Sequence, residues 1–268
     1  MRIMNTEEIN NIKYRFISKF IILKNDPIII YGNQKSGTSV ITALLGTVTG
    51  ESYCNDLFFR MKRSYKKLFD KRISLLKLVN ENKYYFSKRI IKDADLIFFN
   101  DRLTEIFPNA QYVFIIRDPR ENIRSILDRL DISGKNLTIT DFKITHLKKN
   151  LPIWYEIIKG DIYNHSGNNH IESLAKRWDI MSQIYLQNRA KMILVKYEDF
   201  TESNTKIIEE LAQKLNLKCK NNIEIEKKIQ YQPRGKNRGV PFEEFFNKKN
   251  LEIIENICKK NMVKFGYY

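Results

Sequence analysis

The chain has 268 residues, of which 43% are hydrophobic, and a formal net charge of +16. This length and composition allow a full hydrophobic core and exclude a disordered chain, so a single domain over residues 1–268 is the simplest expectation. The excess of Lys and Arg favours an anionic partner, such as a nucleotide, a polyanion or an anionic membrane surface.

The N-terminal part of the chain lacks the layout of a signal peptide or a membrane anchor. Its apolar run, residues 16–23, is interrupted by polar residues and is too short to cross a bilayer. The three cysteines, Cys54, Cys219 and Cys258, are far apart, show no metal-ligand spacing and favour a reducing compartment. The sequence therefore predicts a cytoplasmic protein with no metal site and no membrane span.

The segment from Ile30 to Ser39 is the most informative in the chain. Ile28–Tyr31 predicts a short buried strand, a polar turn with two glycines follows, and an apolar helix starts at the next Thr-Ser pair. A strand, a glycine turn and a helix N-terminus form a nest of backbone N–H groups that can hold a phosphate. Lys35 precedes Gly37, whereas a Walker A loop has Lys after its second glycine. A glycine pair that only shapes a tight turn is the alternative interpretation.

Basic and aromatic residues alternate between residues 58 and 92, and this pattern predicts helices with apolar stripes. A solvated basic helix face is the simplest explanation of such charge. The functional alternatives are a wall that binds an acidic or aromatic acceptor, and a groove for nucleic acid. No named nucleic-acid motif accompanies the stretch, so a nucleic-acid partner is not expected.

A second anion site is predicted at the end of a later strand. Tyr112–Ile116 is almost entirely apolar, as in a central parallel strand, and Asp118 with Pro119 can begin a helix directly after Arg117. Ser125 lies eight residues beyond Arg117, about two turns into that helix, so both side chains can face one crevice. A guanidinium and a hydroxyl suit a phosphate. Pairing of Arg117 with a neighbouring acid is the structural alternative.

Together the two segments resemble the sulfotransferases that use 3′-phosphoadenosine 5′-phosphosulfate (PAPS). In that family a Lys-Ser-Gly-Thr loop after the first strand holds the 5′-phosphosulfate, and an Arg ending a later strand, with a Ser eight residues on, holds the 3′-phosphate. The flanking Phe-Pro-x-Ala and Arg-Asp-Pro-Arg stretches look like the bacterial members. The residues that the resemblance assigns to PAPS are Lys35, Ser36, Gly37, Thr38 and Ser39 in the loop, and Arg117 and Ser125.

Weaker matches extend the likeness over residues 27–240. Tyr197 lies in a Tyr-Glu-Asp stretch that resembles a family segment whose Tyr lies near the adenine. Arg234, Gly235 and Lys236 resemble the start of the family's basic glycine loop over the 3′-phosphate. We expect residues 232–239 to become ordered when the nucleotide binds, because their composition provides little core.

The resemblance implies in-line transfer of a sulfuryl group from PAPS to a hydroxyl or amine of a small-molecule, glycan or lipid acceptor. Adenosine 3′,5′-bisphosphate (PAP) is the expected product, and no metal is expected. Lys35 is expected to neutralise the leaving oxygen, while backbone N–H groups of the loop hold the 5′-phosphate.

The base that deprotonates the acceptor is harder to assign. Cytosolic sulfotransferases have a His after a strand Lys; here Lys92 is followed by two carboxylates and no His. Other branches use a carboxylate, so Asp95, Asp93 and Glu51 are the candidates, with surface charge or helix capping as the alternative. The acceptor pocket is expected among residues 51–90 and 130–170.

Segments 131–145 and 160–170 predict loops because they are rich in Gly, Asn, Ser and Thr. Trp154, Tyr155 and Tyr163 are candidates either to stack on an acceptor or to fill the core.

The predicted fold is a three-layer α/β/α domain with a central, mainly parallel sheet, as in the P-loop NTPase-like sulfotransferase fold. The predicted core strands are Ile28–Tyr31, Ile90–Lys92, Tyr112–Ile116 and Met192–Tyr197. Two alternative functions stay open: a P-loop kinase of a small metabolite, which requires Mg²⁺ and ATP, and a non-catalytic basic nucleic-acid-binding protein.

Overall fold

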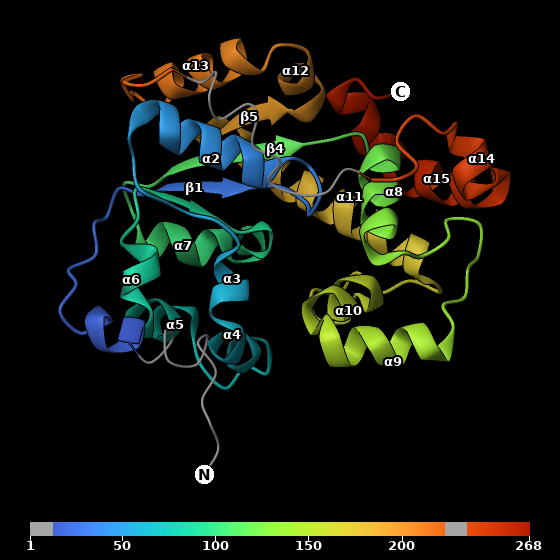
Figure 1. Cartoon of the computed structure of the whole chain (residues 1–268), viewed down its shortest axis with the longest axis horizontal. Coiled ribbons are helices and arrows are strands. Elements are labelled where there is room, and N and C mark those ends of the chain that lie inside the picture. Colours follow the sequence, from blue (N-terminus) through green and yellow to red (C-terminus); the bar gives the residue numbers. More distant parts are fainter. Residues whose placement is uncertain (1–12, 223–234) are drawn as a thin grey trace. The chain divides into compact units, whose positions relative to one another are not determined.

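The computed structural model describes residues 13–222 and 235–268 (Figure 1). The chain divides into two compact units, each assembled from three segments. Unit 1 comprises Met1–Gly32, Gly37–Ile115 and Ala190–Tyr231, and unit 2 comprises Asn33–Ser36, Ile116–Arg189 and Gln232–Tyr268. A single sulfotransferase domain over 1–268 stays a prediction.

A five-stranded sheet forms the centre of unit 1, in the order β2-β3-β1-β4-β5. Its strands are β1 (Ile28–Tyr31), β2 (Tyr53–Cys54), β3 (Ile90–Lys92), β4 (Gln111–Ile116) and β5 (Met192–Lys196). Strand β1 pairs in parallel with β3 and β4, and Ile30 is in register with both Lys92 and Val113. The carboxyl ends of the central strands therefore lie at one edge of the sheet, and the predicted parallel sheet is confirmed.

Helices cover both faces of this sheet (Figure 1). Alternate residues of β1, Ile28 and Ile30, pack with Ile41 of α2 (Thr38–Thr49) and Ile208 of α13 (Asn204–Lys214). On the other face, Tyr31 donates to Asn100 at 3.3 Å, where η1 (Ala94–Phe99) meets α7 (Asn100–Ile106). The predicted three-layer arrangement is thus confirmed within unit 1.

The basic stretch of unit 1 forms short helices, as its apolar stripes predict. They are α3 (Leu57–Arg60), α4 (Lys62–Phe69), α5 (Leu75–Glu81) and α6 (Lys83–Phe86). Several of their apolar side chains, such as Phe58 and Leu78, are buried, while Lys66 and Lys67 are exposed. Strand β5 ends at Lys196, one residue earlier than predicted, because Tyr197 begins α12 (Tyr197–Glu202).

Unit 2 is helical. Its helices are α8 (Pro119–Leu130), α9 (Asp141–Asn150), α10 (Pro152–Lys159), α11 (His170–Asn188), α14 (Phe242–Phe246) and α15 (Lys248–Phe265); η2 (Arg189–Lys191) leads on to β5. Helices α11 and α15 pack together through an edge-to-face contact of Trp178 and Phe265, whose ring centroids are 6.2 Å apart. In the described part of the chain, no helix combines the length and the apolar content needed to span a bilayer.

The loop predicted at 131–145 is only partly correct, since α9 begins at Asp141. Thr140 caps this helix, with its side chain accepting a hydrogen bond from the Lys143 N–H at 3.4 Å, and Leu147 anchors it. The segment looks like a loop because its Thr is an N-cap and because α9 buries a single residue, so the sequence shows no apolar stripe there. Residues 160–169 form the loop that the sequence predicts.

Candidate active site

The loop between β1 and α2 has the predicted strand–turn–helix geometry. Helix α2 begins at Thr38, and its N-cap residue, Gly37, has a φ of 82°. A Cβ atom at Gly37 would lie 2.3 Å from the ring of Tyr197, and one at Gly32 would lie 2.4 Å from the carbonyl oxygen of Ile115. Only glycine fits these positions, and the first N–H groups of α2 point out of the helix end, as phosphate binding requires.

In unit 2, a buried amide holds the middle of the loop. Asn122 of α8 has no exposed surface. Its Nδ2 donates to the carbonyl oxygen of Gln34 at 2.8 Å and to Ser36 Oγ at 2.9 Å, and its Oδ1 accepts from Asn33 Nδ2 at 2.8 Å. The loop backbone is therefore fixed by a neutral group that adds no negative charge beside Lys35 and Arg117. Sequence reasoning missed Asn122; its position three residues before Ser125 was the available signal.

Helix α11 holds the same loop from a second direction. Arg177, which is fully buried, donates from Nε to Asn33 Oδ1 at 3.0 Å and from Nη2 to Gln34 Oε1 at 2.9 Å. The next residue, Trp178, donates from Nε1 to the carbonyl oxygen of Arg117 at 2.8 Å. This short Arg-Trp pair thus fixes both the loop and the chain just after β4.

The two predicted anion-binding segments meet in unit 2. Arg117 donates from Nη1 to the carbonyl oxygen of Lys35 at 2.9 Å and from Nη2 to Glu121 Oε2 at 2.9 Å. Burial, followed by the positive charges of Arg129 and Arg117, lowers the pKa of Lys35 to about 8. The Lys35 ammonium is therefore partly removed from water and lies near other cations.

The face of α8 that carries Ser125 also meets residues 235–237. Ser125 is half-buried and follows Glu121 by one helical turn. Asp128 accepts a hydrogen bond from the backbone N–H of Asn237 at 3.2 Å, and a Cβ at Gly235 would lie 2.4 Å from its Oδ2. The described start of the predicted basic glycine loop therefore contacts Asp128, which follows Ser125 by three residues on α8.

The remaining residues of that glycine loop are less informative. Lys236 is exposed. Arg234 lies outside the described residues, so the ordering of residues 232–239 on nucleotide binding stays a prediction.

A second polar cluster lies in unit 1 at the carboxyl end of β3. Lys92 Nζ donates to Ser39 Oγ at 3.1 Å and pairs with Asp56 Oδ1 at 2.6 Å. The side chain of Lys92 is 5% exposed and that of Asp56 is 42% exposed, so the carboxylate is accessible to solvent while its partner is not. Asp56 was missed because it follows β2, a two-residue strand that no hydrophobic pattern marks.

The predicted bases Asp93 and Asp95 are both buried in unit 1. Asp93 accepts from the N–H of Phe58 at 2.9 Å and from the N–H of Asp95 at 3.0 Å, so it caps η1 and fixes α3. Burial, and secondarily the charge of Asp95, raise the pKa of Asp93 to about 7. Asp95 accepts from the Tyr65 hydroxyl. These hydrogen bonds give both carboxylates structural roles.

The structure does not bring Glu51 to the loop. It follows α2, whose 12 residues place it about 18 Å from Thr38, at the other end of the helix. Its Oε1 lies 4.0 Å from Lys220 Nζ. Trp154 is 8% exposed and belongs to the core of unit 2, and Tyr163 lies with its ring 5.8 Å from the Arg177 guanidinium.

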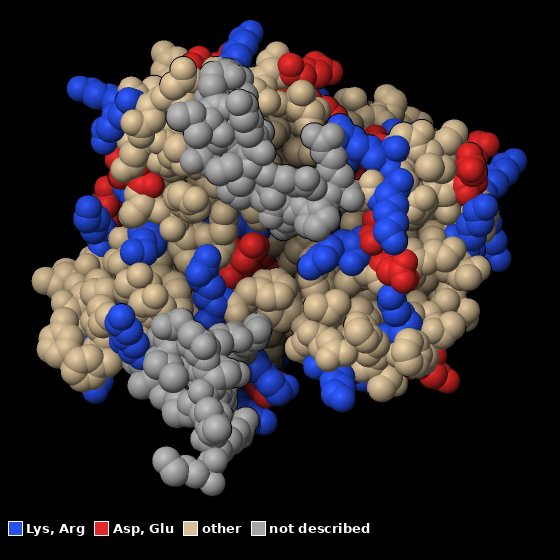
Figure 2. Space-filling view, in the orientation of Figure 1, with Lys and Arg blue, Asp and Glu red and all other residues tan. Residues whose placement is uncertain are grey.

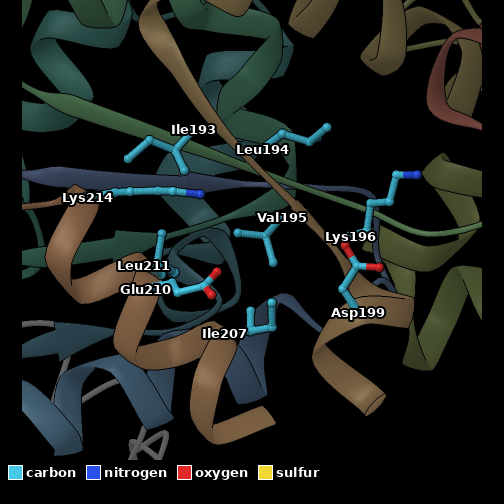
Figure 3. A pocket seen from close by; sticks show the side chains of 9 residues that line it. All are labelled: Ile193, Leu194, Val195, Lys196, Asp199, Ile207, Glu210, Leu211 and Lys214. Atoms are coloured by element: carbon cyan, nitrogen blue, oxygen red, sulfur yellow. The ribbon is translucent and has the colours of Figure 1, made fainter. Parts of the chain in front are cut away.

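A pocket of about 120 Å³ lies on unit 1 beside the edge strand β5 (Figure 3). Its lining residues are Ile193, Leu194, Val195, Lys196, Asp199, Ile207, Glu210, Leu211 and Lys214. The charges around it have both signs, and its volume is below the roughly 300–1,000 Å³ of typical ligand sites. It does not suit a nucleotide, and none of the predicted PAPS residues lines it.

Comparison with solved structures identifies the class of fold. The chain is similar to sulfotransferase STF9 from Mycobacterium avium, with a TM-score of 0.54 and 10% identity over 97% of this chain and 82% of that one. It is also similar to sulfotransferase STF1 from Mycobacterium tuberculosis H37Rv, with a TM-score of 0.53 and 12% identity over 94% and 81% of the two chains. These two similarities show that the chain has the sulfotransferase fold, as its motifs predict. No protein-family model and no curated protein sequence matches the chain.

Proposed function

We propose that this chain is a sulfotransferase that moves a sulfuryl group from PAPS to a hydroxyl or amine of a small-molecule, glycan or lipid acceptor in the cytoplasm. The hydrogen bond from Arg117 to the Lys35 carbonyl oxygen, at 2.9 Å, carries the proposal. It joins, within unit 2, the segments that the resemblance assigns to the 5′-phosphosulfate and the 3′-phosphate.

The groups present fit this donor. The helix N-terminus after Gly37, the Lys35 ammonium and the Arg117 guanidinium only donate hydrogen bonds, as a ligand with phosphates at both ends requires. When bound, PAPS supplies the sulfuryl group and a phosphate leaving group. Lys35, with a pKa of about 8, is largely protonated at neutral pH and is suited to neutralise negative charge at the leaving oxygen.

Arg117 and Ser125 are proposed to hold the 3′-phosphate, with Arg234, Gly235 and Lys236 completing that site. Glu121 now accepts from Arg117 at 2.9 Å, where a phosphate oxygen could replace it as acceptor. The ring of Tyr197, which packs against Gly37, is proposed to lie near the adenine.

We assign the base to Asp56. It is the accessible carboxylate of the polar cluster at the carboxyl end of β3. Lys92 Nζ lies 2.6 Å from Asp56 Oδ1 and 3.1 Å from Ser39 Oγ, so it links Asp56 to the loop. Asp56 takes the proton of the acceptor hydroxyl as the acceptor oxygen bonds to sulfur and the bond from sulfur to the bridging oxygen breaks. Lys92 orients Asp56 and acts only through it.

Calorimetry with PAP, ATP with Mg²⁺ and an oligonucleotide tests the proposal. We expect PAP to bind without added metal and the Lys35→Ala variant to bind it more weakly. Stronger binding of ATP with Mg²⁺ would instead identify a kinase. Oligonucleotide binding that survives Lys35→Ala, with no heat from PAP, would identify a nucleic-acid-binding protein. An acceptor screen by mass spectrometry, which detects the gain of one sulfuryl group, then tests turnover.

A further inference from the structure

Residues 13–24 of unit 1 expose an unusual amount of apolar surface. Three of the eight large hydrophobic side chains that are exposed in the described chain lie here: Phe16 at 60%, Phe20 at 74% and Ile22 at 91%. Exposed apolar side chains that gather in one place mark interaction sites, whereas scattered ones do not.

This segment is anchored through its polar and tyrosine side chains. The Tyr14 ring stacks on Tyr84 of α6, with ring centroids 4.1 Å apart, and Ser18 Oγ accepts from the Tyr84 N–H at 3.0 Å. Arg15 pairs with Glu81 at the end of α5. Because these contacts use the inner face of the helical residues 13–18, the phenylalanines are left on the outer face.

The two exposed phenylalanines contact each other. Phe16 and Phe20 are four residues apart, so they lie one above the other along the chain, and their rings meet edge to face at 5.4 Å. Lys19 places its ammonium 5.9 Å from the Phe16 ring. Phe16 and Phe20 therefore form one apolar surface, and Ile22, two residues further on, adds exposed apolar area to the same segment.

Positive charge borders this surface. Lys13, Lys19 and Lys24 are exposed, and residues 13–25 contain no acidic side chain. The next acid, Asp26, pairs with Arg89 at 3.1 Å. In Figure 2, uncharged surface covers this corner of unit 1, with Lys and Arg side chains along its border.

We propose that residues 13–24 dock the protein on the surface of an anionic lipid bilayer. The aromatic and aliphatic side chains enter the boundary between headgroups and acyl chains, and the lysines contact anionic headgroups, as in interfacial helices. A second copy fits less well, because an isologous contact would bring the lysines of both copies together. This inference stands independently of the proposed sulfotransfer.

Sedimentation of the full chain with phosphatidylcholine vesicles, with and without phosphatidylglycerol, tests the proposal. We expect binding to the vesicles that contain phosphatidylglycerol, and weaker binding as salt increases. The variant F16S/F20S/I22S should lower the partition constant by about tenfold or more. The variant K13Q/K19Q/K24Q should lower it by about a hundredfold at low salt, at about 1 kcal/mol per lysine.

A matched control comes from α9, where Phe142 is 82% exposed and Lys148 and Lys149 are also exposed. The variant F142S/K148Q/K149Q should bind vesicles like the wild type, and thermal melting should show that all variants are folded. An equal loss in this control, or no binding by the wild type, would overturn the proposal. So would a wild-type dimer that becomes monomeric in F16S/F20S/I22S, since a second copy would then occupy the face.

Discussion

The loop around Lys35 in unit 2 and the polar cluster of Lys92 and Asp56 in unit 1 hold their charged groups in different ways. In unit 2, the neutral amide of Asn122 fixes the loop that carries Lys35, and burial, followed by nearby basic side chains, lowers the pKa of that lysine. In unit 1, Lys92 is held between a hydroxyl and the carboxylate of Asp56.

This difference indicates a division of work. A loop fixed by a neutral amide gains no negative charge from that amide and so suits an anionic ligand, whereas a region with an accessible carboxylate can accept a proton. Substitutions in the first should therefore act on nucleotide binding, and substitutions at Asp56 should act on turnover.

The largest effect is expected for Asp56→Asn. Loss of a general base typically lowers kcat by about 10²- to 10⁴-fold, while PAP affinity should stay unchanged because Asp56 is not assigned to the nucleotide. Turnover of the acceptor found by the mass-spectrometric screen, together with PAP calorimetry, measures both quantities. Glu51→Gln is the matched control and should turn over normally. An unchanged kcat in Asp56→Asn would remove it from the mechanism.

Arg117→Ala should lower PAP affinity by about 10- to 100-fold, since a charge-assisted hydrogen bond contributes about 1.5–3 kcal/mol. The affinity for adenosine 5′-monophosphate, which lacks the 3′-phosphate, should change much less. Calorimetry with both nucleotides gives the ratio, and Arg102→Ala, an exposed arginine of α7, serves as the control. Equal losses for the two nucleotides would contradict the assignment of Arg117 to the 3′-phosphate.

PAP affinity should fall as the pH rises above about 8, because burial lowers the pKa of Lys35 to that value and the deprotonated amine no longer attracts the anion. The expected loss begins near pH 8, approaches tenfold per pH unit, and levels off at the higher pKa that Lys35 has when PAP is bound, because bound PAP favours the protonated form. Calorimetry at pH 7, 8 and 9 measures it. Lys35→Arg should show a flat profile over this range, and a wild-type profile just as flat would exclude Lys35 as the titrating group.

Asn122→Ala should weaken PAP binding several-fold and lower the free energy of unfolding by about 1–3 kcal/mol, because Ser36 and Gln34 lose a buried partner. Asn250→Ala offers a matched comparison, since Asn250 is 1% exposed and donates to the Gly134 carbonyl oxygen at 2.8 Å. It should lose stability without losing PAP affinity. Parallel losses in both variants would show that Asn122 acts only on the fold. Chemical denaturation and calorimetry supply the two measurements.

Much of the fold can be predicted from local pattern. Ile28–Tyr31 and Ile90–Lys92 have the bounds that their apolar runs predict, because strands buried on both faces need no polar alternation. Strand β2 has two residues, too few for any periodicity, and α9 begins inside a polar segment. Local composition therefore predicts the central strands better than the elements at the margins.

The candidate site divides in the same way. Lys35, Gly37 and Arg117 could be predicted because strand ends and glycine turns mark them in the sequence. Asn122 and Asp56 could not, since their roles depend on partners distant in the chain: the bond from Asn122 to Gln34 spans 88 positions, and that between Asp56 and Lys92 spans 36. A polar residue in mid-helix or after a very short strand has no local signature of such a partner.

Lys35 has a φ of 69°, in the left-handed region that costs residues with a Cβ about 1 kcal/mol or more. Glycine or asparagine would adopt this backbone more easily, so either substitution should raise the melting temperature while removing the ammonium group. The loop thus retains a side chain that its own conformation disfavours. Selection for thermostability alone would be expected to replace this lysine. Its backbone conformation lowers the stability of the fold, while its side chain supplies the ammonium group, so stability and function are opposed at this one residue.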